Sequence, residues 1–180
     1  MIPSQAEMGE LDEAWAAALS EAEQRARHAG RKDIAEYLSL RNSNDLIRQA
    51  GVDWLIAGFT TLAGDANRAG ASIQISKKEG HRFPIGTSTM VGQLLTLTSG
   101  VRTLSIEAGW PRTPRDGFVR GGGLACANIR HMGIKSASDE LLLSKSTTGA
   151  PAWKSLLRKR LSIHESDIRR HIAILIDKKH

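Results

Sequence analysis

The chain has 180 residues, of which 41% are hydrophobic, 24% are charged and 4% are aromatic. This composition is typical of a globular protein and excludes a disordered chain, and the length suits one domain. The scarcity of aromatic residues argues against a stacking surface for single-stranded nucleic acid. The single cysteine, Cys126, excludes an internal disulfide and a zinc site built from cysteine pairs.

The net charge of +6 is spread unevenly along the chain. Residues 1–60 carry a net charge of −4, residues 61–120 of +4, and residues 121–180 of +6. The basic rear half could therefore meet an anionic partner, such as nucleic acid or a phosphate-bearing ligand. The alternative is that the acidic and basic parts neutralise each other across a dimer contact.

The sequence predicts no membrane partner and a soluble, cytoplasmic protein. The N-terminus lacks the basic start and apolar run of a secretory signal. The longest apolar stretch covers residues 54–63, whereas a helix that crosses a bilayer needs about 17 residues or more.

Residues 1–69 are predicted to form three helices. Ser4 and Glu7 match a capping box, and Gly30 is suited to end the first helix. An apolar stripe with three- and four-residue steps follows the capping box: Met8, Leu11, Trp15, Leu19, Ala22 and Ala26. Residues 33–41 and 45–68 form the second and third helices, with a break at 42–44.

Residues 70–146 are predicted to form an antiparallel sheet of five to six strands. The alternating segments are 72–76, 82–85, 90–98, 101–108, 124–132 and 140–145, with a turn at 77–80. A two-residue turn at Ser99-Gly100 would pair Leu95 with Leu104. One face of this hairpin then gathers Leu95, Leu97, Leu104 and Ile106.

Residues 150–178 are predicted to form two C-terminal helices. The first begins at Pro151, and the second begins at a capping box of Ser162 and Glu165. The first would carry basic residues from Lys154 to Arg160 on one face. That face could grip nucleic acid, an acidic protein or a membrane surface, or could simply be solvated. The predicted fold is one α+β domain covering residues 1–180.

The strongest candidate site is the Gly/Pro/Arg-rich stretch 109–123. Irregular connections of this length are uncommon in compact domains unless they bind something or are disordered. Guanidinium groups suit phosphate or carboxylate, and glycines let backbone N–H groups approach an anion. The predicted anion-binding residues are Arg112, Arg115, Arg120, Arg130 and Lys135. The alternative is a long hairpin with solvated arginines and a turn at Asp116-Gly117.

Catalytic and metal chemistry have weaker support in the sequence. His81, Glu107, Asp116 and His131 could act as acids or bases, but their spacing selects no reaction. His164 and His171 lie seven residues apart on one helix, too far to share an ion, and no metal or other cofactor is expected.

Three functions remain open from the sequence. The first is a non-catalytic binding module for an anionic partner, either nucleic acid or a nucleotide-like ligand, through the arginine-rich loop. The second is a protein–protein interaction or oligomeric subunit that docks through its N-terminal helices. The third is a small phosphodiester hydrolase, so whether the protein is an enzyme stays undecided at this stage.

Overall fold

The computed structural model describes the backbone of residues 5–177 and the side chains of residues 16–177. It divides into unit 1, Met1–Ile47, and unit 2, Arg48–His180. The fold class is α+β with an antiparallel sheet, as predicted, but the chain has two N-terminal helices and one C-terminal helix. The predicted three plus two helices are therefore wrong in number.

Unit 1 contains helix α1, Gln5–His28, and the beginning of helix α2, Lys32–Arg68. Gly30 ends the first helix with a φ of 73°, as predicted, and Arg31 N–H donates to the carbonyl of Ala26. Of the predicted apolar stripe, Leu19 and Ala26 are buried.

The predicted break at residues 42–44 is absent, because α2 runs through it. Asn42, Ser43 and Asn44 lower helix propensity by only a few tenths of a kcal/mol each, and none of them blocks a helix as proline does. Met8, Leu11 and Trp15 lie outside the residues whose side chains are described, as does Ser4 of the predicted capping box.

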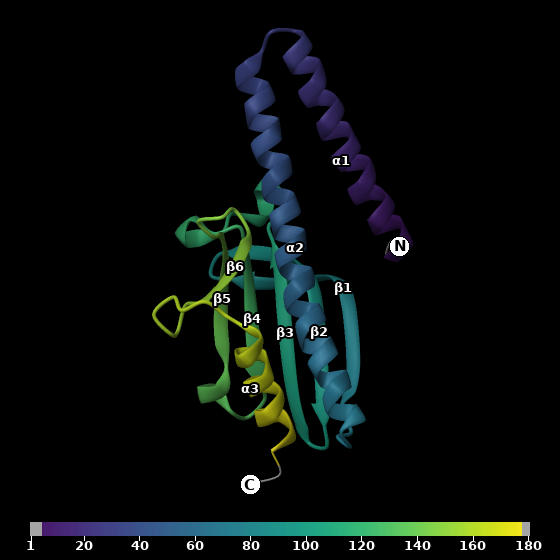
Figure 1. The fold of residues 1–180 in the computed structure, drawn as a ribbon, viewed down its shortest axis with the longest axis vertical. Helices are drawn as coiled ribbons and strands as arrows, with labels where there is room; N and C mark the ends of the chain where they lie inside the picture. Colours follow the sequence, from purple (N-terminus) through teal and green to yellow (C-terminus); the bar gives the residue numbers. More distant parts are fainter. Residues whose placement is uncertain (1–4, 178–180) are drawn as a thin grey trace. The chain divides into compact units, whose positions relative to one another are not determined.

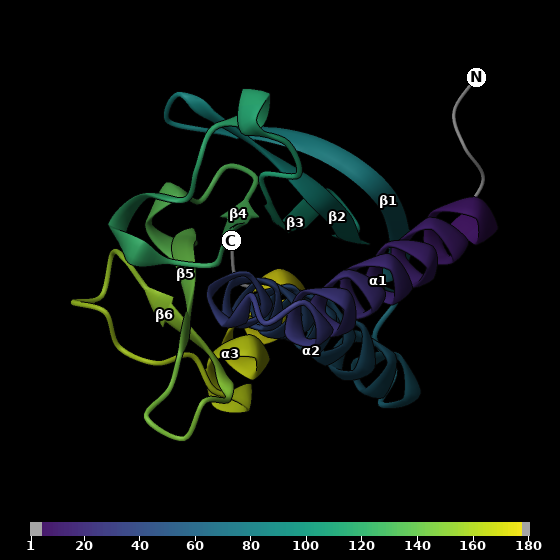
Figure 2. The ribbon, with the colours of Figure 1, turned by 90° about the horizontal axis from the view of Figure 1, so that it is seen from above.

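Unit 2 is built on a six-stranded antiparallel meander in which each strand pairs with the next one in sequence. Figures 1 and 2 show the strands curving around helix α3, Glu165–Ile176, and the part of α2 that belongs to this unit. The strands are β1 (Gln74–Ile85), β2 (Ser88–Ser99), β3 (Arg102–Trp110), β4 (Ala125–His131), β5 (Asp139–Lys145) and β6 (Pro151–Ser155).

The β2–β3 hairpin buries the predicted apolar face. Its four residues, Leu95, Leu97, Leu104 and Ile106, have no exposed surface. The predicted register is wrong, because Leu97 and not Leu95 lies opposite Leu104. The turn is Gly100-Val101, and Gly100 supplies the positive φ of 60° at the first turn position. A shift of two residues in the pairing leaves every side chain on its predicted face.

Strand β1 replaces the two short strands predicted at residues 72–76 and 82–85. The predicted turn at 77–80 is a bulge instead, where the pairing with β2 shifts between Glu79 and His81. Gly80 adopts a φ of 64° there, so the glycine that suggested a turn serves to accommodate an extra residue.

The predicted helix that begins at Pro151 is strand β6 followed by turns. Trp153 and Ser155 are buried at alternate positions, so the segment extends the sheet beside β5. The predicted capping box of Ser162 and Glu165 is also displaced, because α3 begins after His164, whose N–H donates to the Asp167 carboxylate. Apolar residues at steps of three and four positions predicted a helix here. Trp153, the first of them, fits a buried strand position equally well.

Close packing of α2 on the sheet depends on glycine. A Cβ atom at Gly51 would stand 2.7 Å from the Leu143 side chain, and one at Gly58 would stand 2.9 Å from Ile168 on α3. The indole N–H of Trp153 donates to the Gly51 carbonyl over 2.8 Å. These contacts bring α2, the sheet and α3 into one core. None of the helices in the described part of the chain has the length and apolar character to cross a membrane.

Two paired glycines, Gly92 of β2 and Gly109 of β3, mark a close backbone approach in the sheet. We predict that Gly92→Ala lowers the free energy of unfolding by about 3 kcal/mol, a typical cost of overpacking, because its Cβ would stand 2.0 Å from the Ala108 carbonyl oxygen. Urea unfolding would measure the loss. The matched control is Gly64→Ala in α2, where the nearest atom lies 3.7 Å away. A Gly92 variant as stable as this control would contradict the prediction.

Candidate functional site

A basic pocket of about 660 Å³ opens in unit 2, on the same side of the sheet as α3. The loop between β4 and β5 supplies Lys135, Ser136 and Ser138, and the hairpin end of β3 supplies Arg102. Helix α3 and the turn after β6 complete the lining with Leu157, Arg158, Arg170, Ile174 and Asp177; Ile134, Ala137 and Asp139 also take part. Four segments far apart in sequence therefore meet at one site.

The pocket is anchored by Asp139, a buried carboxylate at the start of β5. Its Oδ1 accepts hydrogen bonds from Ser155 Oγ over 2.6 Å and from Glu140 N–H over 2.9 Å. Its Oδ2 accepts from Arg158 Nε over 3.3 Å. A buried carboxylate is stable only when donors replace its lost water, and this one has three.

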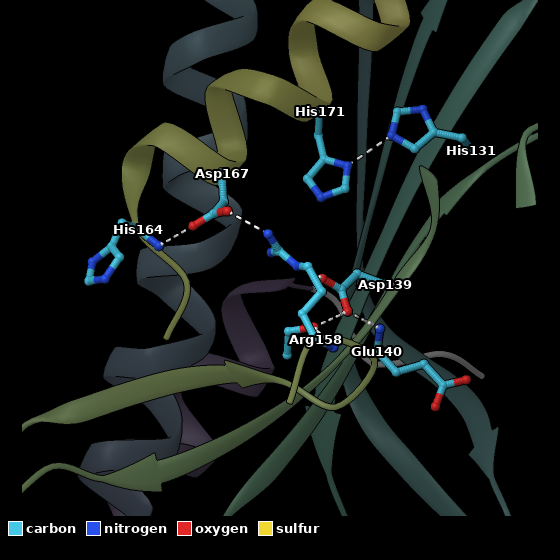
Figure 3. Close-up of polar contacts among 8 residues, drawn as sticks. His131, Asp139, Glu140, Arg158, His164, Asp167 and His171 are labelled. Atoms are coloured by element: carbon cyan, nitrogen blue, oxygen red, sulfur yellow. Dashed lines mark hydrogen bonds and ion pairs between the residues drawn. The ribbon is translucent and has the colours of Figure 1, made fainter. Parts of the chain in front are cut away.

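Arg158 links Asp139 to the beginning of α3. Its Nη1 donates to Asp167 Oδ1 over 2.9 Å, and Asp167 Oδ2 accepts from the His164 N–H over 3.0 Å. Figure 3 shows the guanidinium lying between the two carboxylates. Burial opposes the charge on Arg158, but the hydrogen bonds and charges of Asp167 and Asp139 outweigh it and raise the pKa of the guanidinium. Arg158 is thus a permanently charged structural cation.

The remaining charges make the pocket electropositive. Arg158 is paired with the two carboxylates of Asp139 and Asp167. The other lining cations among the described residues are Arg102, Lys135 and Arg170, and the other lining carboxylate is Asp177, so cations outnumber carboxylates in the lining by four to two. No hydrogen bond or ion pair joins the Lys135 ammonium to another residue in the range 16–177. Arg102 uses Nη1 to hold the Ile174 carbonyl over 2.8 Å, which fixes the guanidinium at the pocket wall.

Two buried histidines pack beside this network (Figure 3). His131 Nε2 and His171 Nδ1 are 2.9 Å apart, and the rings stack with centroids 5.2 Å apart. Burial lowers the pKa of His171 to about 4, with the neighbouring His131 adding to the effect. Burial and the nearby charge of Arg102 also lower the pKa of His131. Both rings are therefore neutral at pH 7 and serve the core.

Among the residues predicted from the sequence, Lys135 lies at the pocket and Arg130 does not. Arg130 is exposed on β4, whereas its neighbour His131 is buried, so the two side chains occupy opposite faces of the sheet. The basic pocket is on the face of His131. Arg130 therefore does not contribute to the pocket that Lys135 lines, because the sheet lies between them.

The loop arginines make separate contacts. The Arg112 guanidinium stacks 3.7 Å from the centre of the Trp110 ring and donates to the Val91 carbonyl, while Arg120 donates to Thr87 Oγ1 over 3.2 Å. Thr87 and Val91 are four residues apart, or about 13 Å along an extended chain. Arg115 is exposed on a short 3₁₀ turn, Pro114–Asp116.

The loop packs around Asp116, whose carboxylate is buried. It accepts hydrogen bonds from Arg82 Nη2 over 2.5 Å and from the backbone N–H groups of Arg112 and Thr113. Burial disfavours the charged carboxylate, but these donors outweigh burial and lower the pKa of Asp116. Asp116 is thus a structural anchor in the loop.

The other candidate acids and bases are engaged with each other. His81 Nε2 lies 2.8 Å from Glu107 Oε1, and Asn128 donates to Glu107 Oε2 over 3.3 Å. They lie on the sheet face opposite His131, because Glu107 pairs with Asn128 in the β3–β4 register. The buried thiol of Cys126 has a pKa raised to about 11 by burial, which leaves it uncharged and a poor nucleophile.

Sequence reasoning missed Arg102, Arg170 and the pocket role of Arg158. Nothing in the sequence relates these positions, because only the order of the strands brings them together. The predicted helix from Pro151 also placed Arg158 on a solvated basic face. Reading Pro151–Ser155 as a strand would have placed Arg158 at the edge of the sheet, beside the loop that holds Lys135.

Comparison with known proteins gave no match to a protein-family model, a curated protein or a solved structure.

The histidine pair predicts how stability depends on pH. Because the folded pKa values of His131 and His171 lie below the usual 6.5, the unfolded chain takes up these protons first as the pH falls. We expect the free energy of unfolding to be unaffected by the pair above pH 6.5. From pH 6.5 down to about 4 the free energy of unfolding should fall by up to about 1.4 kcal/mol per pH unit for the proton of His171, and the lowered pKa of His131 adds to the fall below pH 6.5.

Urea unfolding at several pH values would measure this dependence, with the double variant His131→Leu/His171→Leu as the comparison. The lowered pKa values of Asp116 and Asp167 act in a different window, since their contribution is lost only as the pH falls below the ordinary aspartate value of 3.8. Equal slopes for wild type and double variant between pH 6.5 and 4 would contradict the assignment.

Proposed function

We propose that unit 2 is a binding module for a small anionic ligand that carries phosphate or carboxylate groups, held in the basic pocket. The observation that carries this proposal is the convergence of Arg102, Lys135 and Arg170, beside the already paired Arg158, on one pocket with two lining carboxylates among residues 16–177. One of these carboxylates, Asp139, is already bound to three donors. An anion is the ligand that compensates the remaining charge.

The lining residues offer complementary ways to hold such a group. Lys135 provides a point charge on a flexible stem, and Arg170 provides the flat fork of donors that matches phosphate or carboxylate. Ser138 Oγ accepts from the His131 N–H over 3.3 Å, which leaves its own hydroxyl hydrogen able to donate to a ligand. Ser136 adds a second exposed hydroxyl.

The size and the apolar part of the lining favour a compact organic anion over a long polymer. Small-molecule sites commonly enclose about 300–1,000 Å³, and this pocket falls within that range. Ile134, Leu157 and Ile174 provide apolar surface for the uncharged part of the ligand. A nucleotide-sized molecule matches this combination, whereas a nucleic-acid backbone needs an extended basic groove.

Binding is favoured over catalysis because the lining contributed by residues 16–177 contains no histidine, cysteine or tyrosine. The adjacent histidines are buried and uncharged, and Arg158 and Asp139 neutralise each other. Such groups position a ligand, and neither lining serine has a hydrogen bond to a described histidine ring that would activate it as a nucleophile.

Charge reversal in the pocket tests the proposal. We expect Lys135→Glu/Arg170→Glu to weaken the binding of inorganic pyrophosphate about a hundredfold, since each charge-assisted hydrogen bond contributes about 1.5–3 kcal/mol. Isothermal titration calorimetry at low and high sodium chloride would measure the affinity, and wild-type binding should weaken with salt.

The matched control is Lys78→Glu/Arg115→Glu, which makes the same change in net charge at two exposed residues outside the pocket. It should bind pyrophosphate nearly as well as wild type. If this control lost binding while the pocket variant kept it, the arginine-rich loop would be the site and the pocket assignment would be wrong.

A further inference from the structure

We infer that unit 1 joins two copies of this chain, through a stripe on helix α2 that pairs in parallel with the same stripe of the second copy. The stripe consists of Tyr37, Leu40, Asn44 and Ile47, all in the part of α2 that belongs to unit 1. The inference is independent of the basic pocket, whose described lining residues belong to unit 2.

Unit 1 buries few apolar side chains of its own. Among residues 16–47 the buried positions are Leu19, Ala26 and Ala35, and two of these three are alanines. Tyr37 and Leu40, in contrast, are 61% and 56% exposed. Figure 1 shows α1 and this part of α2 as two antiparallel helices joined by a short turn. Because most helical stability in proteins comes from packing of an apolar face, we expect these helices to bury a further face against a partner.

The stripe lies outside the small core that unit 1 forms by itself. Ala35 is 3% exposed and is the one buried position of α2 among residues 32–47. Successive residues of a helix turn by about 100°, so Tyr37, Leu40, Asn44 and Ile47 centre on the side of α2 opposite Ala35. Tyr37 and Leu40 are the exposed members of the stripe, and the other two are half-buried. The face that packs within unit 1 and the face that carries the stripe are therefore different.

The spacing of the stripe is that of a two-stranded coiled coil. Its members follow one another at steps of three, four and three residues, so they occupy the a, d, a and d positions of two successive heptads. Tyr37 and Asn44 are then a residues, and Leu40 and Ile47 are d residues. Paired helices of this kind interlock their a and d side chains. Because the stripe covers two heptads only, we expect a weak dimer with a dissociation constant of about 10–100 μM.

Asn44 favours a second copy of this chain as the occupant. In a parallel pair related by a twofold axis, equivalent a residues lie side by side, so Asn44 meets Asn44 of the second copy. An amide group both donates and accepts, which lets two identical amides bond to each other. An antiparallel pair places a residues against d residues and would leave this amide facing an apolar side chain. A single asparagine at an a position also selects the register and the two-stranded state.

The charges beside the stripe are complementary in the same pairing. Glu36 directly precedes Tyr37 at a g position, and Arg41 directly follows Leu40 at an e position. In a parallel pair, the g residue of one helix lies beside the e residue of the next heptad in the other helix. Glu36 of each copy therefore lies beside Arg41 of the other, and the twofold axis forms this ion pair twice.

Sedimentation velocity of the full chain from about 1 μM to 1 mM measures the association, and wild type should pass from monomer to dimer over this range. We expect Leu40→Asp to raise the dissociation constant about a hundredfold, because each dimer loses two buried leucines. The matched control is Leu46→Asp. Leu46 is 63% exposed on the same helix but occupies a c position outside the stripe, so this variant should dimerise as wild type does. Circular dichroism checks that both variants fold.

Cysteine cross-linking tests the parallel register. The native Cys126 is buried and is replaced by Cys126→Ala in both variants. Asn44→Cys/Cys126→Ala should form a disulfide-linked dimer under mild oxidation, because equivalent a residues face each other across the twofold axis. Leu46→Cys/Cys126→Ala is the matched control and should stay largely uncross-linked. Non-reducing electrophoresis measures the linked fraction.

The outcomes decide the inference without involving the pocket. Wild type that stays monomeric at about 1 mM would overturn it, since the stripe would then need a different partner. An equal loss of dimer in Leu40→Asp and Leu46→Asp would also overturn it, as would equal cross-linking of the two cysteine variants or none in either. Lys135 and Arg170 are unchanged in every variant, so the binding of pyrophosphate tests the proposed function separately.

Discussion

A buried carboxylate, Asp139, controls the architecture of the pocket. Removing an ionised carboxylate from water costs several kcal/mol unless hydrogen bonds and a partner charge replace the solvent. Ser155, Arg158 and the Glu140 N–H meet this requirement, and each belongs to a segment that the carboxylate thereby holds in place. The end of β6 and the turn after it are tied to the start of β5 for this reason.

The same constraint extends to α3 through Arg158. Because its guanidinium also holds Asp167, the first turn of the helix is fixed relative to the sheet. Arg170 lies about one turn further along this helix and lines the pocket. Lys135 lines the same pocket from the loop between β4 and β5. The position of Arg170 at the pocket thus depends on a helix whose first turn is held by the Asp139–Arg158–Asp167 network.

The two buried histidines beside the charge network are uncharged members of the core. His131 and His171 lie close to Arg158 and Asp139, yet burial keeps both rings uncharged at neutral pH. Ionised side chains there would repel the arginines that surround them. The site gains its positive charge from lysine and arginine side chains.

The sequence predicted the parts of the fold that depend on local residue patterns. Alternating residues identified the β2–β3 hairpin and its buried face, and Gly30 identified the end of α1. The prediction failed where tertiary contacts decide the structure. Pro151–Ser155 is a strand because Trp153 and Ser155 find partners on α2 and β5, and no local signal reveals those partners.

Candidate site residues were harder to predict than the fold. The arginine-rich loop was predicted as the site because its charges are close together in sequence. In the structure, Arg112 and Arg120 contact different residues. Of the five predicted residues, Lys135 alone lines the basic pocket. Its companions come from positions 102, 158 and 170, and the six-stranded order that unites them is not a property of any short segment.

The most direct test of the central claim is a titration of the isotope-labelled protein with inorganic phosphate, followed by the backbone amide signals in two-dimensional nuclear magnetic resonance. The proposal predicts saturable shifts concentrated at residues 135–138 and next to Arg102, Arg158 and Arg170. Shifts confined to residues 109–123, or no saturable shifts at all, would contradict it.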